Sequence, residues 1–336
     1  MDVTRTDLIR PPDAFSLESS ANEVREQTFT RSTELWFDDG TLIIEANGVY
    51  FRVYKGILSA NSPVFEDMLS IPQPVEDDTV VYEGCPVVKL YDSSTDMMHF
   101  LKALHFSSYY DATKLTPFAV VSAVLRLSTK YQVDFLRQRA FKQLSAIYPT
   151  TLSEWDKRES VSAAIETFEA RPFAVFLLAR ETNTLTLLPT ALYLCADSQE
   201  IDYILDGLNS FDGAHIELEW PDKRACLRAR ESLALDLRSR VFAFLTGQLP
   251  LPGCRNTTVC NNMRLRWLQS VESSLGSGIF SVQFPWGQFR SGVCEYCYAA
   301  SQAHYKSERT KLWDELPGKF GLPSWDNLKR TVSDLV

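Results

Sequence analysis

Short apolar runs separated by polar breaks follow residue 30, and this pattern predicts strands. Two short apolar runs, Leu35–Phe37 and Leu42–Ile44, flank an Asp-Asp-Gly-Thr break. A third run, Val49–Val53, follows Asn47-Gly48. An Asn-Gly pair between two β-prone runs is typical of a two-residue hairpin. We therefore expect three short strands, the last two joined as a hairpin.

The spacing of apolar residues then changes to the helical period. Leu58 and, after Ser62-Pro63, the apolar positions of Val64–Leu69 predict a pair of short helices. A further strand is expected at Val87–Tyr91, a run of β-branched and aromatic residues. Three later stretches with helical spacing complete the expected α+β unit: Met97–Leu104, Phe118–Tyr131 and Phe135–Leu144.

These segments, in this order, resemble the BTB/POZ domain. The resemblance lies in F-x-V-x-K-x-x-L-x-x-x-S-x-x-F-x-x-M-L, from Phe51 to Leu69, and in an apolar helix that ends at Lys130-Tyr131 before an amphipathic helix. Two positions depart from the family pattern: Tyr54 stands where a histidine is usual, and His105 where an aromatic residue usually closes the helix. The family is a protein-interaction fold, so the resemblance implies recruitment of partners and not catalysis.

The region from residue 149 onward has a helical pattern that begins with a capping box, Thr151–Glu154. It resembles the extended carboxy-terminal region of many basidiomycete (fungal) BTB-domain proteins. The expected fold class is α+β: a BTB/POZ domain at residues 31–148, then an all-helical carboxy-terminal domain at residues 149–336. Residues 1–30 are polar without periodicity, and we expect them to be disordered.

Two helices and one aromatic run stand out in the carboxy-terminal region. A charged helix is expected from the capping box to about Ala170, and a long one at Lys223–Thr246. The run Ile279–Phe289 has two interpretations: a core element, or an exposed docking patch anchored by Trp286 and Phe289. Core is favoured, because large apolar residues are usually buried.

Charge and cysteine content narrow the classes of partner. The 336 residues include 43 acidic and 34 basic side chains, a net charge of −9, which disfavours nucleic acid. No apolar run approaches the roughly 18 residues of a membrane span, so no membrane partner is expected. Seven cysteines in a chain without a recognisable secretory signal favour a reducing compartment. The expected location is the cytoplasm or the nucleus.

Four of these cysteines are the best chemical candidate in the sequence. Cys254 and Cys260 are followed, after residues 261–293, by the C-x-x-C pair Cys294 and Cys297. Two pairs of thiolates satisfy the ligand set of a tetrahedral structural Zn²⁺ site. Two alternatives stay open: unliganded, partly buried thiols, which the wide spacing of the first pair favours, and a redox C-x-x-C. We expect no other cofactor.

Catalytic motifs are missing from the sequence. The chain has no G-x-S-x-G elbow, no G-x-x-x-x-G-K-[ST] loop, no G-x-G-x-x-G and no H-E-x-x-H. None of its four histidines lies beside a nominated nucleophile or acid. We therefore expect no enzyme, no catalytic residues and no small-molecule substrate.

The resemblance implies a protein partner, and two hypotheses about its kind stay open. In some family members the BTB unit binds a cullin scaffold, and the second domain presents a substrate to a ubiquitin ligase. Such adaptors often carry a hydrophobic-x-Glu motif after the helix pair, and the nearest counterpart here is Pro74-Val75-Glu76. The contact surface that the resemblance implies consists of Met68, Leu69, Val75 and Glu76. The alternative is a transcriptional or scaffold module that forms a homodimer without a cullin.

Overall fold

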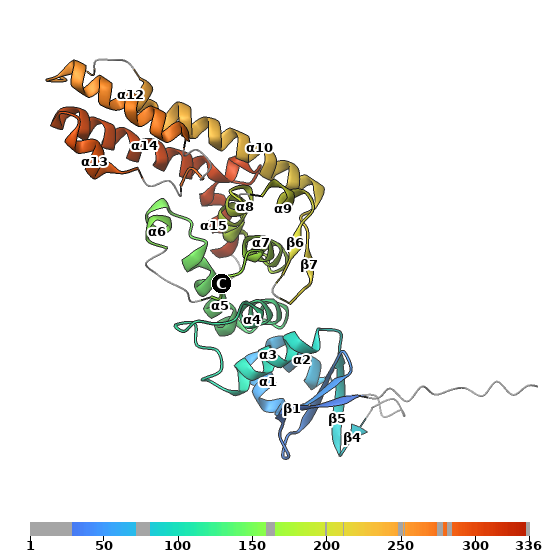
Figure 1. The fold of residues 1–336 in the computed structure, drawn as a ribbon. Coiled ribbons are helices and arrows are strands. Elements are labelled where there is room, and N and C mark those ends of the chain that lie inside the picture. The colour runs from blue at the N-terminus through green and yellow to red at the C-terminus, as the bar shows by residue number, and fades with distance from the viewer. Residues whose placement is uncertain are drawn as a thin grey trace, which may run out of the picture.

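A computed structural model of the chain describes residues 29–71, 81–158, 165–198, 200–210, 212–247, 251, 253–273, 278–280 and 284–333. Figure 1 shows an elongated molecule, with a sheet and its helices at one end and helices alone toward the other. Of residues 1–30, which we expected to be disordered, residues 1–28 lie outside the described part of the chain.

The five-stranded sheet is mixed, with the strand order β1-β3-β2-β5-β4. Its strands are β1 (Thr30–Trp36), β2 (Leu42–Ala46), β3 (Val49–Val53), β4 (Val81–Tyr82) and β5 (Cys85–Leu90). The predicted hairpin joins β2 to β3, where Asn47 (φ 45°) and Gly48 (φ 78°) adopt the left-handed backbone that a type I′ turn requires. β1 pairs in parallel with β3, and β2 pairs in parallel with β5. The strands predicted from the sequence are therefore confirmed.

Five helices pack with this sheet to form the α+β unit. They are α1 (Lys55–Asn61), α2 (Pro63–Ser70), α3 (Ser94–His105), α4 (Phe118–Lys130) and α5 (Asp134–Ile147). α2 begins where the sequence predicted, because the Ser62 side chain accepts a hydrogen bond from the Phe65 amide at 3.0 Å and Pro63 takes the first helical position. Alternate strand residues such as Ile44 and Phe51 point into the main core below the helices.

The rest of the described chain is helical apart from one short hairpin, β6 (Leu208–Asn209) and β7 (His215–Ile216). Its elements are α6 (Leu152–Lys157), α7 (Arg171–Glu181), the 3₁₀ turn η1 (Leu185–Leu187), α8 (Leu188–Ala196), α9 (Ile201–Leu205), α10 (Trp220–Asp236), the π-helical segment η2 (Leu237–Val241), α11 (Ala243–Thr246), α12 (Thr257–Ser273), α13 (Trp286–Ser291), α14 (Glu295–Lys319) and α15 (Trp325–Ser333). None of the helices in the described ranges is long and apolar enough to cross a membrane.

Two of the predicted helices differ from the expectation, and the first of them, α6, is shorter than predicted. The predicted cap by Thr151 is confirmed, since its hydroxyl accepts from the Glu154 amide at 3.3 Å, and the Glu154 carboxylate reaches back to that hydroxyl at 2.7 Å. However, α6 ends at Lys157 instead of continuing to about Ala170. The chain beyond returns to the first unit, where the Glu166 amide donates to the carbonyl of Thr116 at 3.0 Å. That backbone pairing, as an isolated bridge, is incompatible with a helix there.

The long helix predicted at Lys223–Thr246 is interrupted by η2. Within η2 the Phe242 amide bonds the carbonyl of Leu237, five residues back, at 3.0 Å. The aromatic run Ile279–Phe289 belongs to the core, as favoured: its described members Ile279, Phe280, Phe284 and Phe289 are buried. The alternative interpretation was a docking patch anchored by Trp286 and Phe289. Phe289 cannot be such an anchor because its ring is fully buried, whereas Trp286 is only partly buried.

The helical region packs directly on the first unit through α4. Phe118, at the start of α4, lies 5.2 Å from the ring of Phe168, which precedes α7. Arg126 forms ion pairs with Asp96 of α3 at 2.6 Å and with Glu181 of α7 at 2.8 Å. A single cluster of buried apolar side chains extends from the sheet to α15. The two parts therefore share one continuous core.

The two positions that depart from the family pattern, Tyr54 and His105, pack on the same ring. Phe37 lies 4.9 Å from Tyr54 and 5.5 Å from His105, measured between ring centroids. The His105 Nδ1 donates to the Leu101 carbonyl at 2.8 Å, and its Nε2 is buried without a hydrogen-bond partner among the described residues. Burial lowers the pKa of His105, because a proton on Nε2 would have no acceptor.

We expect acidification below about pH 6.5, the pKa of an unperturbed histidine, to destabilise this region. The folded pKa lies below the unfolded one, so the unfolded chain binds the proton first and stability falls as the pH drops through this window. His105→Phe, which supplies a ring without a titrating group, should remove the His105 share of this loss. Urea unfolding of both proteins at about pH 5.5 and about pH 7.5 measures it. An equal loss in wild type and variant would contradict the assignment, and the exposed His215→Gln is the control.

Candidate functional site

The end of the α1–α2 helix pair forms the first candidate surface. Met68 and Leu69 lie in the last turn of α2, where each is half-buried and packs on the core with one side. The Lys55 ammonium donates to the Leu69 carbonyl at 2.8 Å and holds the end of α2 against α1. Just beyond the helix, Ile71 has 63% of its surface exposed. Apolar side chains therefore reach the surface where the sequence placed a partner contact.

The other two residues of that predicted contact, Val75 and Glu76, lie outside the described residues. Their segment is flanked by Ile71 and by Val81, which has 59% of its surface exposed. The structure thus places Met68 and Leu69 at the surface next to this segment, and the four-residue surface as a whole stays a prediction.

The sheet carries a second, separate apolar cluster on the side away from the main core, and we call it the aromatic face. It consists of buried Ile43, Tyr50 and Cys85 with the partly buried Phe29, Trp36, Tyr82 and Val87. Phe29 stacks on Tyr50, with ring centroids 3.9 Å apart, and Tyr82 meets Phe29 edge-on at 4.8 Å. The Arg31 guanidinium lies 4.7 Å from the centre of the Trp36 ring. The sequence analysis missed this face, although the alternation of Tyr50 with Phe51 signals two apolar sides.

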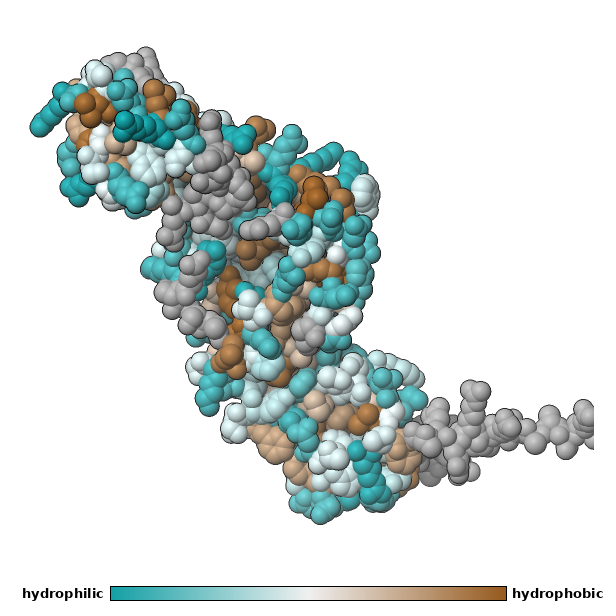
Figure 2. Space-filling view, in the orientation of Figure 1, coloured by the Kyte–Doolittle hydropathy of each residue, from teal (hydrophilic) through white to brown (hydrophobic). Residues whose placement is uncertain are grey.

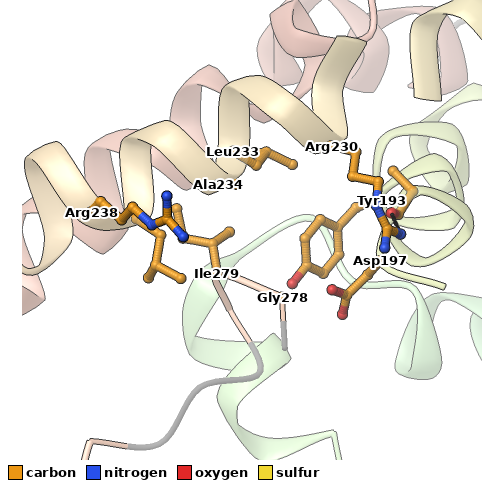
Figure 3. A pocket seen from close by; sticks show the side chains of 10 residues that line it. Tyr193, Asp197, Arg230, Leu233, Ala234, Arg238, Gly278 and Ile279 are labelled. Carbon is orange, nitrogen blue, oxygen red and sulfur yellow. Dashed lines mark hydrogen bonds between the residues drawn. The ribbon is translucent and has the colours of Figure 1, made fainter. Parts of the chain in front are cut away.

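A small hollow between α8 and α10 is lined by charged side chains (Figure 3). Figure 3 shows Arg238 and Arg230 at the two ends of the hollow, with apolar side chains between them and Asp197 on the Arg230 side. Arg230 donates to the carbonyl of Ala196 at 3.0 Å and to that of Ser198. Its positive charge thus stabilises the partial negative charge at the C-terminal end of α8. The hollow measures about 120 Å³, well below the roughly 300 Å³ of the smallest ordinary ligand pockets. Its residues are accounted for by packing.

A wider groove of about 910 Å³ runs between α6, α14 and α15. Two tryptophans in its wall are held by hydrogen bonds: the Trp313 indole donates to the Thr150 carbonyl at 3.1 Å, and the Trp325 indole to the Trp313 carbonyl at 2.8 Å. Across the groove, Arg309 pairs with Asp156 at 2.7 Å. Hydrogen bonds and an ion pair thus hold several side chains of the groove in place. Of the residues singled out in the sequence, Trp286 lines the groove.

The four predicted cysteines meet at the N-terminal ends of α12 and α14. The sulfur atoms of Cys254, Cys260, Cys294 and Cys297 all lie within 4.8 Å of one another. A tetrahedral Zn²⁺ with Zn–S bonds of about 2.3 Å would separate its sulfur ligands by about 3.8 Å, so the thiols need little movement to reach that geometry. The quartet that the sequence singled out is therefore brought together, and it could hold a metal ion.

Backbone amides and helix termini surround these sulfur atoms. The amides of Arg255 and Cys297 donate to the Cys294 sulfur and lower the pKa of that thiol to about 6. The Cys294 amide in turn donates to the Cys260 sulfur at 3.2 Å. Burial raises the pKa values of Cys260 and Cys297. The Cys294 thiol therefore ionises near neutral pH, whereas a nearby cation would favour ionisation of the Cys260 and Cys297 thiols.

The surface around the quartet is partly apolar. Three large side chains on α12 and α14 are about half exposed: Val259, Leu265 and Tyr296. On the face drawn in Figure 2, apolar residues appear as separate patches among polar ones, including patches at the end formed by α12–α14. Patches of this kind are normal on a folded surface and do not by themselves identify a binding site.

Comparison with known protein families identifies the first unit. Residues 30–148, which contain β1–β5 and α1–α5, match the BTB/POZ domain family. A search of curated proteins found no match. BTB domains are protein-interaction modules and are not typically enzymes. Residues 30–148 of this chain are therefore a BTB/POZ domain, and a helical region follows it.

Proposed function

We propose that this chain recruits protein partners, with its BTB domain as one contact surface and its helical region, residues 149–336, as another. The family match over residues 30–148 carries this proposal. The helical extension is of the kind that we associate with basidiomycete BTB proteins. All seven cysteines are free thiols, which suits the reducing conditions of the cytoplasm or nucleus.

The partner that we assign to the BTB surface is the cullin scaffold of a ubiquitin ligase. The end of α2 supports this role, because Met68, Leu69 and the exposed Ile71 form an apolar strip that leads into the segment with Val75 and Glu76. Met68 and Leu69 are preorganised by their packing on the core, so their ordering on binding costs little. The helical region would then present the substrate.

We expect Glu76→Ala, or the double substitution Met68→Ala and Leu69→Ala, to lower the amount of co-purified cullin by about tenfold. A tenfold loss corresponds to about 1.4 kcal/mol, which is modest for a central interface residue. Affinity purification of the tagged full-length chain with quantitative mass spectrometry provides the measurement. Glu231→Ala, at an exposed position of α10, is the matched control. Wild-type cullin recovery in both Glu76→Ala and the double variant would exclude this surface. Thermal unfolding must first show that the double variant is folded.

A second candidate function, a homodimeric scaffold without a cullin, is supported by the aromatic face. Trp36 and Tyr82 are only partly buried there. Trp36 is the last residue of the outer strand β1, and Tyr82 is the last residue of the outer strand β4. A second copy of the chain placed on this side would cover both rings with an identical apolar surface, as a two-fold dimer requires. BTB domains as a family also mediate dimerisation.

Under this second hypothesis the chain should have twice its monomer mass in light scattering at micromolar concentration. Trp36→Ser should shift the mass toward that of the 38.2 kDa monomer, because it removes the largest ring of the aromatic face. Tyr91→Ser, at a side chain that is 90% exposed, serves as the control and should leave the mass unchanged. A wild-type chain that is monomeric at every concentration would rule out the scaffold hypothesis.

For the cofactor, we propose that Cys254, Cys260, Cys294 and Cys297 bind one structural Zn²⁺. The approach of all four sulfur atoms within 4.8 Å supports this proposal over isolated thiols. The metal would join the first turns of α12 and α14 and fix the end of the molecule that these helices form. The Zn²⁺ would stabilise the folded chain to the extent that it binds the folded more tightly than the unfolded state.

Metal analysis of the purified full-length chain should find about one equivalent of zinc, which a chelator removes with a fall in melting temperature. Cys294→Ser should lose most of this zinc because it removes one of four ligands. Cys85→Ser, which changes a buried thiol of the BTB domain, should keep it. A folded wild-type chain that stays metal-free after incubation with zinc would refute the proposal.

A further inference from the structure

A buried arginine, Arg264, lies on the same face of α12 as Cys260, one of the four thiols. Arg264 follows Cys260 by four residues, and residues at this spacing are neighbours along a helix. Each has only 1% of its surface exposed. Burial lowers the pKa of Arg264, and negative charge on Cys297, Cys254 and Cys260 acts in the opposite direction, so the guanidinium lies within electrostatic range of three of the four sulfurs.

The known contacts of Arg264 leave its charge uncompensated. Its Nε donates to the Phe244 carbonyl at 2.6 Å. Its Nη2 is buried and has no hydrogen-bond acceptor among the described residues. A guanidinium stays protonated in proteins, and a buried charge is costly unless an opposite charge lies beside it. In the metal-free chain only Cys294 has a lowered pKa, and burial, which raises the pKa values of Cys260 and Cys297, keeps those two thiols neutral.

A zinc centre with four thiolates supplies the missing charge. Four thiolates and one Zn²⁺ leave an excess of two negative charges, delocalised over the sulfur atoms. We propose that Arg264 is the positioning residue of this centre: its buried guanidinium, with Nη2 not engaged by any other described residue, compensates the charge of the ligand sulfurs. This inference rests on the zinc site proposed above and adds a residue outside the ligand set that sets the affinity for the metal.

A purely structural role for Arg264 makes a different prediction. If Arg264 acted only through its bond to Phe244 and its packing, its removal would lower the folding stability of the zinc-bound and the zinc-free chain equally. As a counter-charge it favours the bound form, because four thiolates around one Zn²⁺ carry more negative charge than the metal-free thiols. Arg264→Met keeps the length and apolar character of the stem and removes the charge. The zinc affinity of this variant therefore separates the two roles.

The experiment compares the full-length wild type, Arg264→Met, Arg264→Lys and Arg266→Met. Arg266 is exposed on the same helix and provides the matched control. Zinc dissociation constants come from competition with a chromogenic chelator, and melting temperatures are recorded with and without zinc. We expect Arg264→Met to bind zinc roughly 10- to 100-fold more weakly, with a smaller zinc-dependent rise in melting temperature. Arg264→Lys should recover part of the affinity, and Arg266→Met should equal the wild type.

Several results would overturn the role of Arg264 while leaving the zinc site intact. These are wild-type affinity in Arg264→Met, equal weakening in Arg264→Lys and Arg264→Met, or an Arg264→Met chain that is unfolded both with and without zinc. If the wild type itself binds no zinc, the proposed metal site fails, and this inference fails with it. The wild-type titration thus distinguishes the two failures.

Discussion

Burial of α4 on opposite sides is the constraint on which both parts of the chain depend. A helix that is apolar around most of its circumference has to be covered by neighbours on each face. Within the BTB domain α3 and α5 cover α4, and from the helical region α7 covers it. Arg126 reaches from α4 to a carboxylate on each side, Asp96 and Glu181. The helical region is therefore part of what stabilises the BTB domain.

Much of the α+β unit could be predicted from the sequence because its signals act over a few residues. Asn47-Gly48 sets the hairpin by its own backbone, and Ser62-Pro63 sets the start of α2 by its own cap. The helix after Thr151 was predicted too long because its end depends on a distant partner, the Thr116 carbonyl that binds the amide of Glu166. Local periodicity contains no information about such a contact.

The candidate sites show the same division between local and distant determinants. The cysteine quartet could be predicted as a set of ligand types, whereas its closeness depends on how α12 and α14 pack. Arg264 had no signal of its own in the sequence, since the role that we propose for it follows from its burial and from the cysteines near it. The aromatic face had a signal in the alternation of Tyr50 and Phe51, but its partner rings come from separate strands.

The continuous core has a geometric consequence for any assembly built on this chain. Domains joined by a flexible linker swivel, whereas domains with a large shared apolar interface move as one. The BTB domain and the end formed by α12–α14 lie at opposite ends of the elongated molecule (Figure 1). Two proteins bound at these ends would be held at a constant separation and orientation, so the chain would act as a rigid spacer between them.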